Sequence, residues 1–330
     1  MILSNCITDV HGILVGHAHN EAALTGCTVV ICPKGAVSGV DQRGGAPGTR
    51  ETDALRPMHL VQKAHAIILS GGSAFGLDSA TGVMKYLEEN KVGFNTGVVR
   101  VPIVASAVLF DLGIGNAMIR PDAEMGYQAC LAASDGIIAE GNVGVGTGAT
   151  AGKLFGNKQA FKTGVGTSSI KIGNLVVGAL VAVNPFGDVI DPETNQIIAG
   201  ARSFKKVGIQ FGENEYFADT LSSMGSTFGK AILKLSGFNN TVIGVVATNA
   251  KLSKEETNKM AQMAQDGIAM TIRPAHTMLD GDTIFSLATG EHHEDVNLVG
   301  AYTAKAVAQA IVRAVKNAIP AGGLPAYSNI

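Results

Sequence analysis

The stretch Asn239-Asn240-Thr241-Val242-Ile243-Gly244-Val245-Val246-Ala247-Thr248 joins a polar turn directly to a run of strand-forming residues. The run is apolar on both faces, which is typical of a strand in a sheet that is covered on both sides. Thr241 would therefore stand at the very start of a buried strand. This layout suits an enzyme that cuts its own chain before Thr241. An ordinary Asn-Thr turn entering a strand is the competing interpretation.

A threonine released in this way would carry both parts of a nucleophilic catalyst. A hydroxyl needs a base within hydrogen-bond reach. A free α-amino group has a reference pKa of about 7.7–8.0, against about 10.4 for lysine, so it accepts a proton near neutral pH. Because the amine belongs to the same residue as the hydroxyl, Thr241 would be the threonine-amine variant of a catalytic triad.

Two carboxylates follow forty residues later, at the mouth of another strand-like run, in Leu279-Asp280-Gly281-Asp282-Thr283. Side chains two residues apart share a face in extended backbone. Asp280 and Asp282 could then hold the amine of Thr241 and assist proton transfer. A solvated Asp-Gly-Asp turn is the alternative that the local sequence leaves open.

Two further stretches offer polar groups beside buried strands. Asn184 ends the run Leu180–Val183, where its carboxamide could donate to an oxyanion, or could be a plain turn residue before Pro185. The glycine-rich stretch from Gly144 to Lys153 is no phosphate loop, because Thr147 and Leu154 stand where that motif needs glycine and serine or threonine. We expect its glycines to let backbone approach backbone near a site, with Lys153 as a local charge.

Composition narrows the class of protein. The 330 residues are 46% hydrophobic and only 16% charged, with a mean hydropathy of +0.25, yet no run of 18 apolar residues occurs. We therefore expect buried sheets and subunit contacts, with no membrane span and no secretory signal. A net charge of −2 and 5% aromatic residues argue against nucleic-acid binding. The spacing of the histidines argues against a metal, and no cofactor is expected.

The cysteines show no C-x-x-C pairing, so we expect reduced, mostly buried thiols in a cytoplasmic protein, with a disulfide between Cys27 and Cys32 as the alternative. The four are Cys6, Cys27, Cys32 and Cys130.

Hydrophobic periodicity predicts many short strands and five helices without a linker between domains. The predicted strands are 13–15, 28–32, 66–69, 101–104, 176–183, 242–248 and 283–288. The predicted helices are 75–90, 124–133, 220–235, 254–270 and 297–317. Ser253 and Glu256 have the spacing of a capping box at the start of the fourth helix. Residues 188–216 are the least regular part, and we expect a solvent-exposed excursion there, leading to a flexible approach to Thr241.

Several segments together resemble a known family. They are Ile7–Val10 with Val15–His17, Arg43-Gly44-Gly45-Ala46-Pro47-Gly48-Thr49-Arg50-Glu51-Thr52-Asp53, Gly71–Leu77, Val143–Ala149 and Asn240–Ala250. The chain resembles the autoprocessed aminopeptidases, which include the L-aminopeptidase/D-amino-acid esterase-amidases, the β-peptidyl aminopeptidases and the nylon-oligomer endohydrolases. The resemblance covers nearly the whole chain, and it favours the functional interpretation of each local motif.

The resemblance implies an α+β fold, a four-layer αββα sandwich of the N-terminal-nucleophile type. It implies a single domain that is cleaved between Asn240 and Thr241 into a long fragment, 1–240, and a short fragment, 241–330. By position, Thr241 matches the family nucleophile, Asn184 the oxyanion donor, and Lys153 a lysine that lines the site in the nylon-oligomer branch. A homo-oligomer is also implied, with a tetramer as one candidate.

The acidic pair and one aromatic residue distinguish this chain within the family. Asp280-Gly281-Asp282 is closer to the nylon-oligomer branch than to the Ser-Gly-Glu of the aminopeptidase branch. Phe110 stands where a site tyrosine would fall, so no hydroxyl is available there. We expect a self-processing amidohydrolase or aminopeptidase acting on small peptides or on amides and esters of amino acids, including β- or ω-amino amides. The alternatives are an acyltransferase like the ornithine acetyltransferases, or an uncleaved, non-catalytic scaffold that binds a small molecule.

Overall fold

The fold is built around one long sheet. The computed structural model describes residues 3–206, 209–212, 216–233 and 240–330. Among these residues the largest sheet has nine strands, in the order β10-β11-β16-β18-β2-β4-β7-β3, with β1 beside β2. Their bounds are β1 Leu14–Asn20, β2 Thr25–Gln42, β3 Thr49–Arg50, β4 Lys63–Ser70, β7 Val104–Val108, β10 Val165–Ile172, β11 Leu175–Asn184, β16 Thr241–Ala250 and β18 Thr283–His292.

Strand β2 connects the two halves of this sheet. Residues 37–42 of β2 pair with β18, whereas residues 27–37 pair with β4. The register shifts between Ile31 and Ala36, where Gly35 has a φ of +70°. A bulge of this kind bends a strand and increases its twist, so one strand can run from one half of the sheet into the other.

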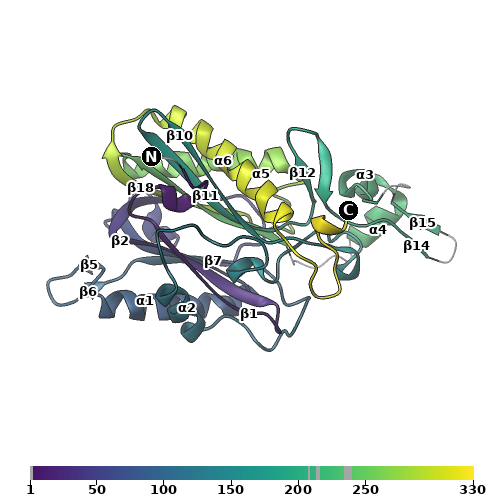
Figure 1. Ribbon diagram of the computed structural model, residues 1–330, viewed down its shortest axis with the longest axis horizontal. Coiled ribbons are helices and arrows are strands. Elements are labelled where there is room, and N and C mark those ends of the chain that lie inside the picture. The colour runs from purple at the N-terminus through teal and green to yellow at the C-terminus, as the bar shows by residue number, and fades with distance from the viewer. Residues whose placement is uncertain (1–2, 207–208, 213–215, 234–239) are drawn as a thin grey trace.

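Helices cover the outer faces of both halves, as Figure 1 shows: α5 and α6 lie on one side of the strands and α1 and α2 on the other. Their bounds are α1 Ser79–Glu89, α2 Ala123–Leu131, α5 Lys254–Thr271 and α6 Val296–Lys316. The smaller elements are β5 Phe94–Asn95, β6 Arg100–Val101, β8 Thr150–Ala151, β9 Phe161–Lys162, β12 Asp188–Asp191, β13 Gln196–Ala199, β14 Phe204–Lys206, β15 Ile209–Phe211, α3 Thr220–Gly225, α4 Thr227–Leu233 and β17 Ile272–Arg273.

Three hydrophobic cores separate these layers. The central core joins side chains of β16 and β18, such as Val245 and Phe285, to Ile67 of β4. The second core packs the other face of β16 against α5 and α6, and the third packs β2 and β4 against α1 and α2. Alternate residues of one strand thus enter different cores, which is the period of two expected for a strand. The result is the predicted four-layer αββα sandwich.

Most predicted elements are confirmed, with boundary corrections. Helices α5 and α6 and strands β11 and β16 lie where the periodicity placed them. The predicted helix 220–235 is wrong as a single element, because Ser226 is extended and its Oγ accepts the N–H of Gly229, so α4 begins anew. The end of that prediction, 234–235, lies outside the described residues. The predicted helix 75–90 begins as a 3-10 turn, Ser73–Asp78.

The prediction of an exposed excursion at 188–216 is confirmed for residues 192–196, which are exposed, and is wrong for the residues on either side of them. Strand β12 is fully buried, and residues 198–201 are buried as well. The Asp188 carboxylate helps to explain this burial. It accepts the N–H of Ala201 at 3.0 Å and the N–H of Thr220 at 2.6 Å, so it ties two later parts of the chain to β12.

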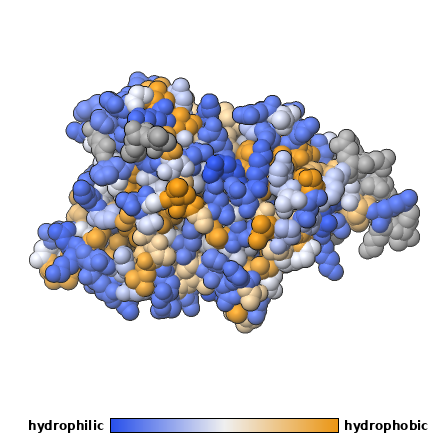
Figure 2. All heavy atoms as spheres, viewed as in Figure 1, coloured by the Kyte–Doolittle hydropathy of each residue, from blue (hydrophilic) through white to orange (hydrophobic). Residues whose placement is uncertain are grey.

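The apolar composition is largely internal. Helix α6 is long and apolar enough to cross a membrane by length and composition, but 61% of its apolar window is buried inside the protein, as expected for a core helix. In the view of Figure 2 the surface is mostly hydrophilic, with separate hydrophobic areas. All four cysteines are free and buried, which confirms the prediction of reduced, buried thiols.

Candidate active site

Three chain segments meet at the start of β16. Thr241 is the first residue of the strand and is 4% exposed. Its register partner on the antiparallel strand β11 is Asn184, the last residue of that strand. On the other side β16 runs parallel to β18, with Ile243 opposite Thr283, so the loop that precedes β18 lies beside Thr241.

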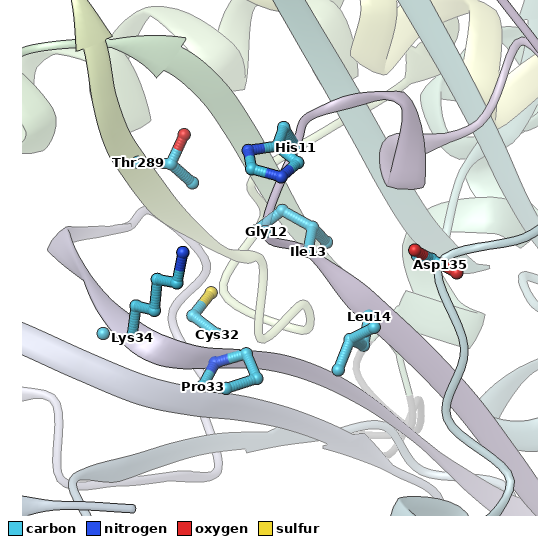
Figure 3. A pocket seen from close by; sticks show the side chains of 10 residues that line it. His11, Gly12, Ile13, Leu14, Cys32, Pro33, Lys34, Asp135 and Thr289 are labelled. Carbon is cyan, nitrogen blue, oxygen red and sulfur yellow. The ribbon is translucent and has the colours of Figure 1, made fainter.

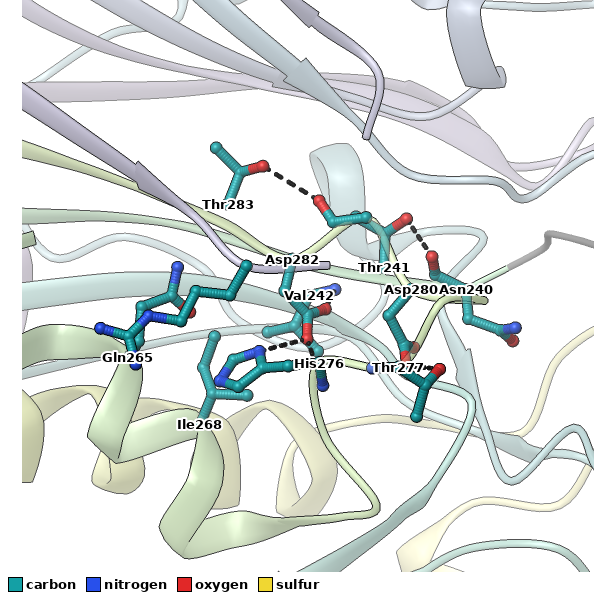
Figure 4. Close-up of polar contacts among 12 residues, drawn as sticks. Asn240, Thr241, Val242, Gln265, Ile268, His276, Thr277, Asp280, Asp282 and Thr283 are labelled. Atoms are coloured by element: carbon teal, nitrogen blue, oxygen red, sulfur yellow. Dashed lines mark hydrogen bonds and ion pairs between the residues drawn. The ribbon is translucent and has the colours of Figure 1, made fainter. Parts of the chain in front are cut away.

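This loop carries the two predicted carboxylates, Asp280 and Asp282 (Figure 4). Both side chains are buried. Asp282 Oδ1 accepts the N–H of Val242 at 2.8 Å, and Asp280 Oδ1 accepts the N–H of Phe186 at 3.1 Å. Burial, and then the charge of Asp282, raise the pKa of Asp280 to about 6. The alternative of a solvated Asp-Gly-Asp turn is therefore wrong.

Two residues that the sequence analysis did not single out fix these carboxylates. His276 donates its backbone N–H to Asp282 Oδ2 at 3.1 Å, and its Nδ1 lies 2.8 Å from the same oxygen. Thr277 donates both its N–H and its hydroxyl to Asp280 Oδ2. Their position in the sequence could have indicated this role, because a histidine and a threonine three to six residues before an acidic pair fall within one loop.

The glycine-rich segment Arg43–Gly48 covers the same loop from outside. The N–H of Ala46 binds the carbonyl of Asp280 at 2.8 Å, and the N–H of Arg43 binds that of Asp282 at 3.0 Å. A Cβ on Gly44 would lie 2.2 Å from the Asp280 carbonyl oxygen, so only glycine allows this approach. The segment thus holds the acidic loop against the start of β16.

Lys153 and Asn184 are both buried and are hydrogen-bonded to each other, and Asn184 is the register partner of Thr241. The Lys153 ammonium donates to Asn184 Oδ1 at 2.9 Å, and to the carbonyls of Thr150 at 2.8 Å and Asn184 at 2.9 Å. The N–H of Thr150 donates to the same Oδ1 at 3.0 Å. Since Oδ1 is occupied by donors, the amide orientation is fixed and Nδ2 is its donor end, which binds the Phe110 carbonyl at 3.1 Å. Burial lowers the pKa of Lys153 to about 7.

The glycines before Lys153 allow the close approach that was predicted for them. A Cβ on Gly146 would lie 2.2 Å from the nitrogen of Val165, and one on Gly152 would lie 1.8 Å from that of Ala201. A second buried lysine, Lys162, donates to the carbonyls of Gly146 and Ala149 at 3.0 Å each. This loop therefore has a fixed shape, and it delivers Thr150 and Lys153 to Asn184.

The peptide bond between Asn240 and Thr241 is itself in contact with the site. The hydroxyl of Thr241 donates to the carbonyl oxygen of Asn240 (Figure 4). The N–H of Gly281 donates to the same oxygen at 3.0 Å. Asn240 also forms a parallel bridge with Asp280. The predicted nucleophile, the predicted cleavage site and the acidic loop are thus adjacent.

A cavity lies away from this site. Its volume is about 350 Å³, and it lies between the start of β1, the bulge of β2 and the far part of β18 (Figure 3). One of its lining residues, Thr289, lies six residues beyond Thr283 in β18. This is a separation of roughly 20 Å along a strand, so the cavity is distant from Thr241. The lining residues are His11, Gly12, Ile13, Leu14, Cys32, Pro33, Lys34, Gly35, Asp135 and Thr289. None of the predicted site residues contributes to it.

Comparison with known proteins identifies the family and the fold of this chain. Peptidase family S58 matches residues 5–327. An uncharacterized aminopeptidase of Mycobacterium tuberculosis (strain ATCC 25618 / H37Rv) is 42% identical, and the match covers 99% of this chain and 98% of that protein. A 6-aminohexanoate-oligomer endohydrolase of Kocuria sp. (strain KY2) is 32% identical over 86% of this chain and 74% of its own length.

Solved structures show the same fold. A beta-aminopeptidase of Burkholderia sp. superposes with a TM-score of 0.66 at 22% identity, covering 97% of this chain and 89% of that one. The L-aminopeptidase D-Ala-esterase/amidase of Ochrobactrum anthropi, described as a variant of the Ntn-hydrolase fold, gives a TM-score of 0.68 at 18% identity over 97% and 88%. This chain therefore belongs to peptidase family S58 and is a hydrolase of peptide or amide bonds.

Proposed function

We propose that this protein is a self-processing amidohydrolase whose nucleophile is Thr241. The observation that carries the proposal is the contact between the Thr241 hydroxyl and the carbonyl oxygen of Asn240, within the peptide bond that would be cut. The Gly281 N–H lies on the same oxygen, which is where negative charge develops when a carbonyl is attacked. Both contacts are present in the intact chain.

In self-cleavage the acyl group of Asn240 is first transferred from nitrogen to the Thr241 hydroxyl, and the resulting ester is then hydrolysed. The Oγ of Thr241 attacks the carbonyl carbon of Asn240, and the Gly281 N–H stabilises the oxyanion. The bond from that carbon to the Thr241 nitrogen breaks, the nitrogen takes up the hydroxyl proton, and an ester on Oγ remains. Water then cleaves the ester, leaving a carboxylate on Asn240 and restoring the hydroxyl of Thr241.

In the processed enzyme the new α-amine of Thr241 acts as the base. Asp282 binds the N–H of the next residue, Val242, so its carboxylate lies beside this amine and can hold its protonated form. Asp280 supplies a second negative charge nearby. The hydroxyl then attacks a substrate amide, the amine passes its proton to the leaving group, and water releases the acyl group.

For external substrates the proposed oxyanion donors are Asn184 and a backbone N–H, that of Gly281, and Lys153 positions Asn184. Support comes from the register, which places Asn184 opposite Thr241, and from the fixed orientation of its amide. Phe110 contributes only its backbone carbonyl to this contact. We propose small peptides or amino-acyl amides and esters as substrates, including β- or ω-amino amides, which the names of the relatives support.

Intact mass spectrometry under denaturing conditions tests the proposal. Wild type should give fragments of about 25 and 9 kDa, the shares of 33.9 kDa carried by residues 1–240 and 241–330. The short fragment should begin at Thr241. Thr241→Ala should remain one species and hydrolyse no amide, whereas Thr241→Ser, which keeps a hydroxyl, should still be processed. A cleaved and active Thr241→Ala protein would refute the proposal.

A further inference from the structure

The residue on the acyl side of the proposed cleavage site occupies a defined place in the protein. Asn240 is 3% exposed and lies beside Asp280 in a parallel bridge. Its carbonyl oxygen is held by Gly281, and its side-chain Nδ2 donates to the carbonyl of Leu279 at 3.4 Å. The backbone of one loop, 279–281, therefore contacts both the carbonyl and the side-chain nitrogen of this acyl group.

The other end of the carboxamide is not accommodated. Oδ1 of Asn240 is buried and has no hydrogen-bond partner among residues 3–206, 209–212, 216–233 and 240–330. Burying an acceptor without a donor is unfavourable, whereas a donor at the position of Nδ2 finds an acceptor in Leu279. The described residues thus offer an acceptor to the N–H donor of Asn240 and no donor to its side-chain oxygen.

We infer that the place of Asn240 is the acyl subsite for external substrates, and that it selects an ω-amino acyl group with its amine on the third carbon from the scissile carbonyl, as in a 4-aminobutanoyl amide. The inference rests on the proposed function, since it requires Thr241 as nucleophile. During self-cleavage the acyl group of Asn240 is transferred to Thr241 Oγ, which is the atom that carries the acyl group of any substrate. The two acyl-enzymes differ only in the atoms attached beyond the carbonyl carbon.

Bond counting gives the chain length. In Asn240 the carbonyl carbon is followed by Cα, Cβ and Cγ, and then by Nδ2. In a 4-aminobutanoyl group it is followed by three methylene carbons and then by the amine. The amine can therefore reach Leu279 in the manner of Nδ2, and no oxygen corresponds to Oδ1. Asp280 forms a backbone bridge with Asn240, and its carboxylate, which accepts from Phe186 and Thr277, is the negative charge that this loop offers to an ammonium.

Four other acyl groups differ from 4-aminobutanoyl in their length or in the polar atoms that they carry. A β-alanyl group is one bond shorter and a 6-aminohexanoyl group is two bonds longer. A butanoyl group has the right length but no donor, and an asparaginyl group repeats the unpaired oxygen. Loss of a hydrogen bond from a charged donor lowers kcat/KM by about tenfold or more. The kcat/KM for the 4-aminobutanoyl amide should therefore exceed that for each of the other four by at least this factor.

The experiment compares kcat/KM of the self-processed wild-type enzyme for the p-nitroanilides of these five acyl groups, with enzyme-free blanks because a 4-aminobutanoyl anilide can cyclise. A maximum at 4-aminobutanoyl, about tenfold above butanoyl, supports the inference. Equal rates for those two, or a maximum at another acyl group, overturn it while leaving Thr241 as nucleophile. An unprocessed protein that hydrolyses none of them overturns the proposed function as well.

A variant tests the same subsite from within the chain. Leucine has nearly the shape of asparagine but no N–H, so Asn240→Leu should slow self-cleavage about tenfold relative to wild type. The amount of intact chain during a time course of expression measures this rate. Cleavage of Asn240→Leu at the wild-type rate would show that the contact with Leu279 does not help to seat the acyl group.

Discussion

Gly281 offers the sharpest test of the site geometry, because replacing it with alanine adds a single carbon between the acidic loop and Thr241. That Cβ would lie 2.7 Å from the carbonyl oxygen of Ala46 and 3.0 Å from the Oγ of Thr241. An ordinary contact begins near 3.4 Å, so the loop must retreat by about 0.7 Å from Ala46. A retreat of this size along the bond from Gly281 to Asn240 would lengthen that 3.0 Å hydrogen bond to as much as about 3.7 Å, beyond hydrogen-bond reach.

Two effects of different size are expected for Gly281→Ala. Loss of one oxyanion donor costs about 10²–10³ in rate, so self-cleavage should slow by that factor. Overpacking costs about 1–3 kcal/mol in the free energy of unfolding, which is a shift of only a few degrees in the melting temperature. The assay follows the intact chain by denaturing mass spectrometry after a pulse of synthesis, alongside thermal unfolding of the same preparation.

Gly225→Ala is the matched control. A Cβ on Gly225, at the end of α3, meets no atom within 4 Å, so this variant should process normally and keep its stability. If Gly281→Ala is also processed at the wild-type rate, then the contact of its N–H with the Asn240 carbonyl has no part in cleavage. The reasoning from the site geometry would then be refuted.

The other predictions concern the charged groups and one helix terminus. Lys153→Met removes the ammonium that orients Asn184, so kcat for amide hydrolysis should fall by less than the ~10²–10³ expected for Asn184→Ala; an equal or larger fall would contradict an indirect role. Because the pKa of Asp280 is about 6 and its charged form is expected to assist proton transfer from the Thr241 hydroxyl, self-cleavage should slow about tenfold per pH unit below pH 6. Asp280→Asn should lack this dependence, and a profile flat from pH 5 to 8 in wild type would exclude Asp280. The folded-state pKa of Asp280 lies above its unfolded value, so the free energy of unfolding should fall as pH rises from about 4 to 6, and urea titration should show a smaller slope in Asp280→Asn. Ser253→Ala removes the cap of α5 and should cost about 1 kcal/mol in urea unfolding, without an effect on processing.

The position of the site along the chain followed from local sequence patterns. Thr241 at the start of an apolar strand, Asp280 and Asp282 at the mouth of another, and the Ser253–Glu256 capping box depend on residues a few positions apart, and hydrophobic periodicity reports such neighbours directly. The covered sheets followed in the same way, because strands that are apolar on both faces require a layer on each side.

Errors arose where a local signal had two interpretations. The predicted strand 28–32 is too short, because β2 continues through Pro33-Lys34-Gly35 as a bulge, and pairing with β4 before it and with β18 beyond it holds the backbone extended. Residues 188–191 and 198–201 lie in an irregular part of the sequence, yet they are buried, because Asp188 binds backbone groups that lie 13 and 32 residues further along the chain.

The sequence by itself determined which residues could act: a threonine that begins a buried strand, an acidic pair, an asparagine that ends a strand, and a lysine after a run of glycines. Only the tertiary structure decided how they meet. The β11–β16 register sets Asn184 opposite Thr241, the 144–153 loop brings Lys153 onto Asn184, and Arg43–Ala46 close over Asp280. Strand register and backbone approach depend on groups far apart in the chain, and no local propensity encodes them.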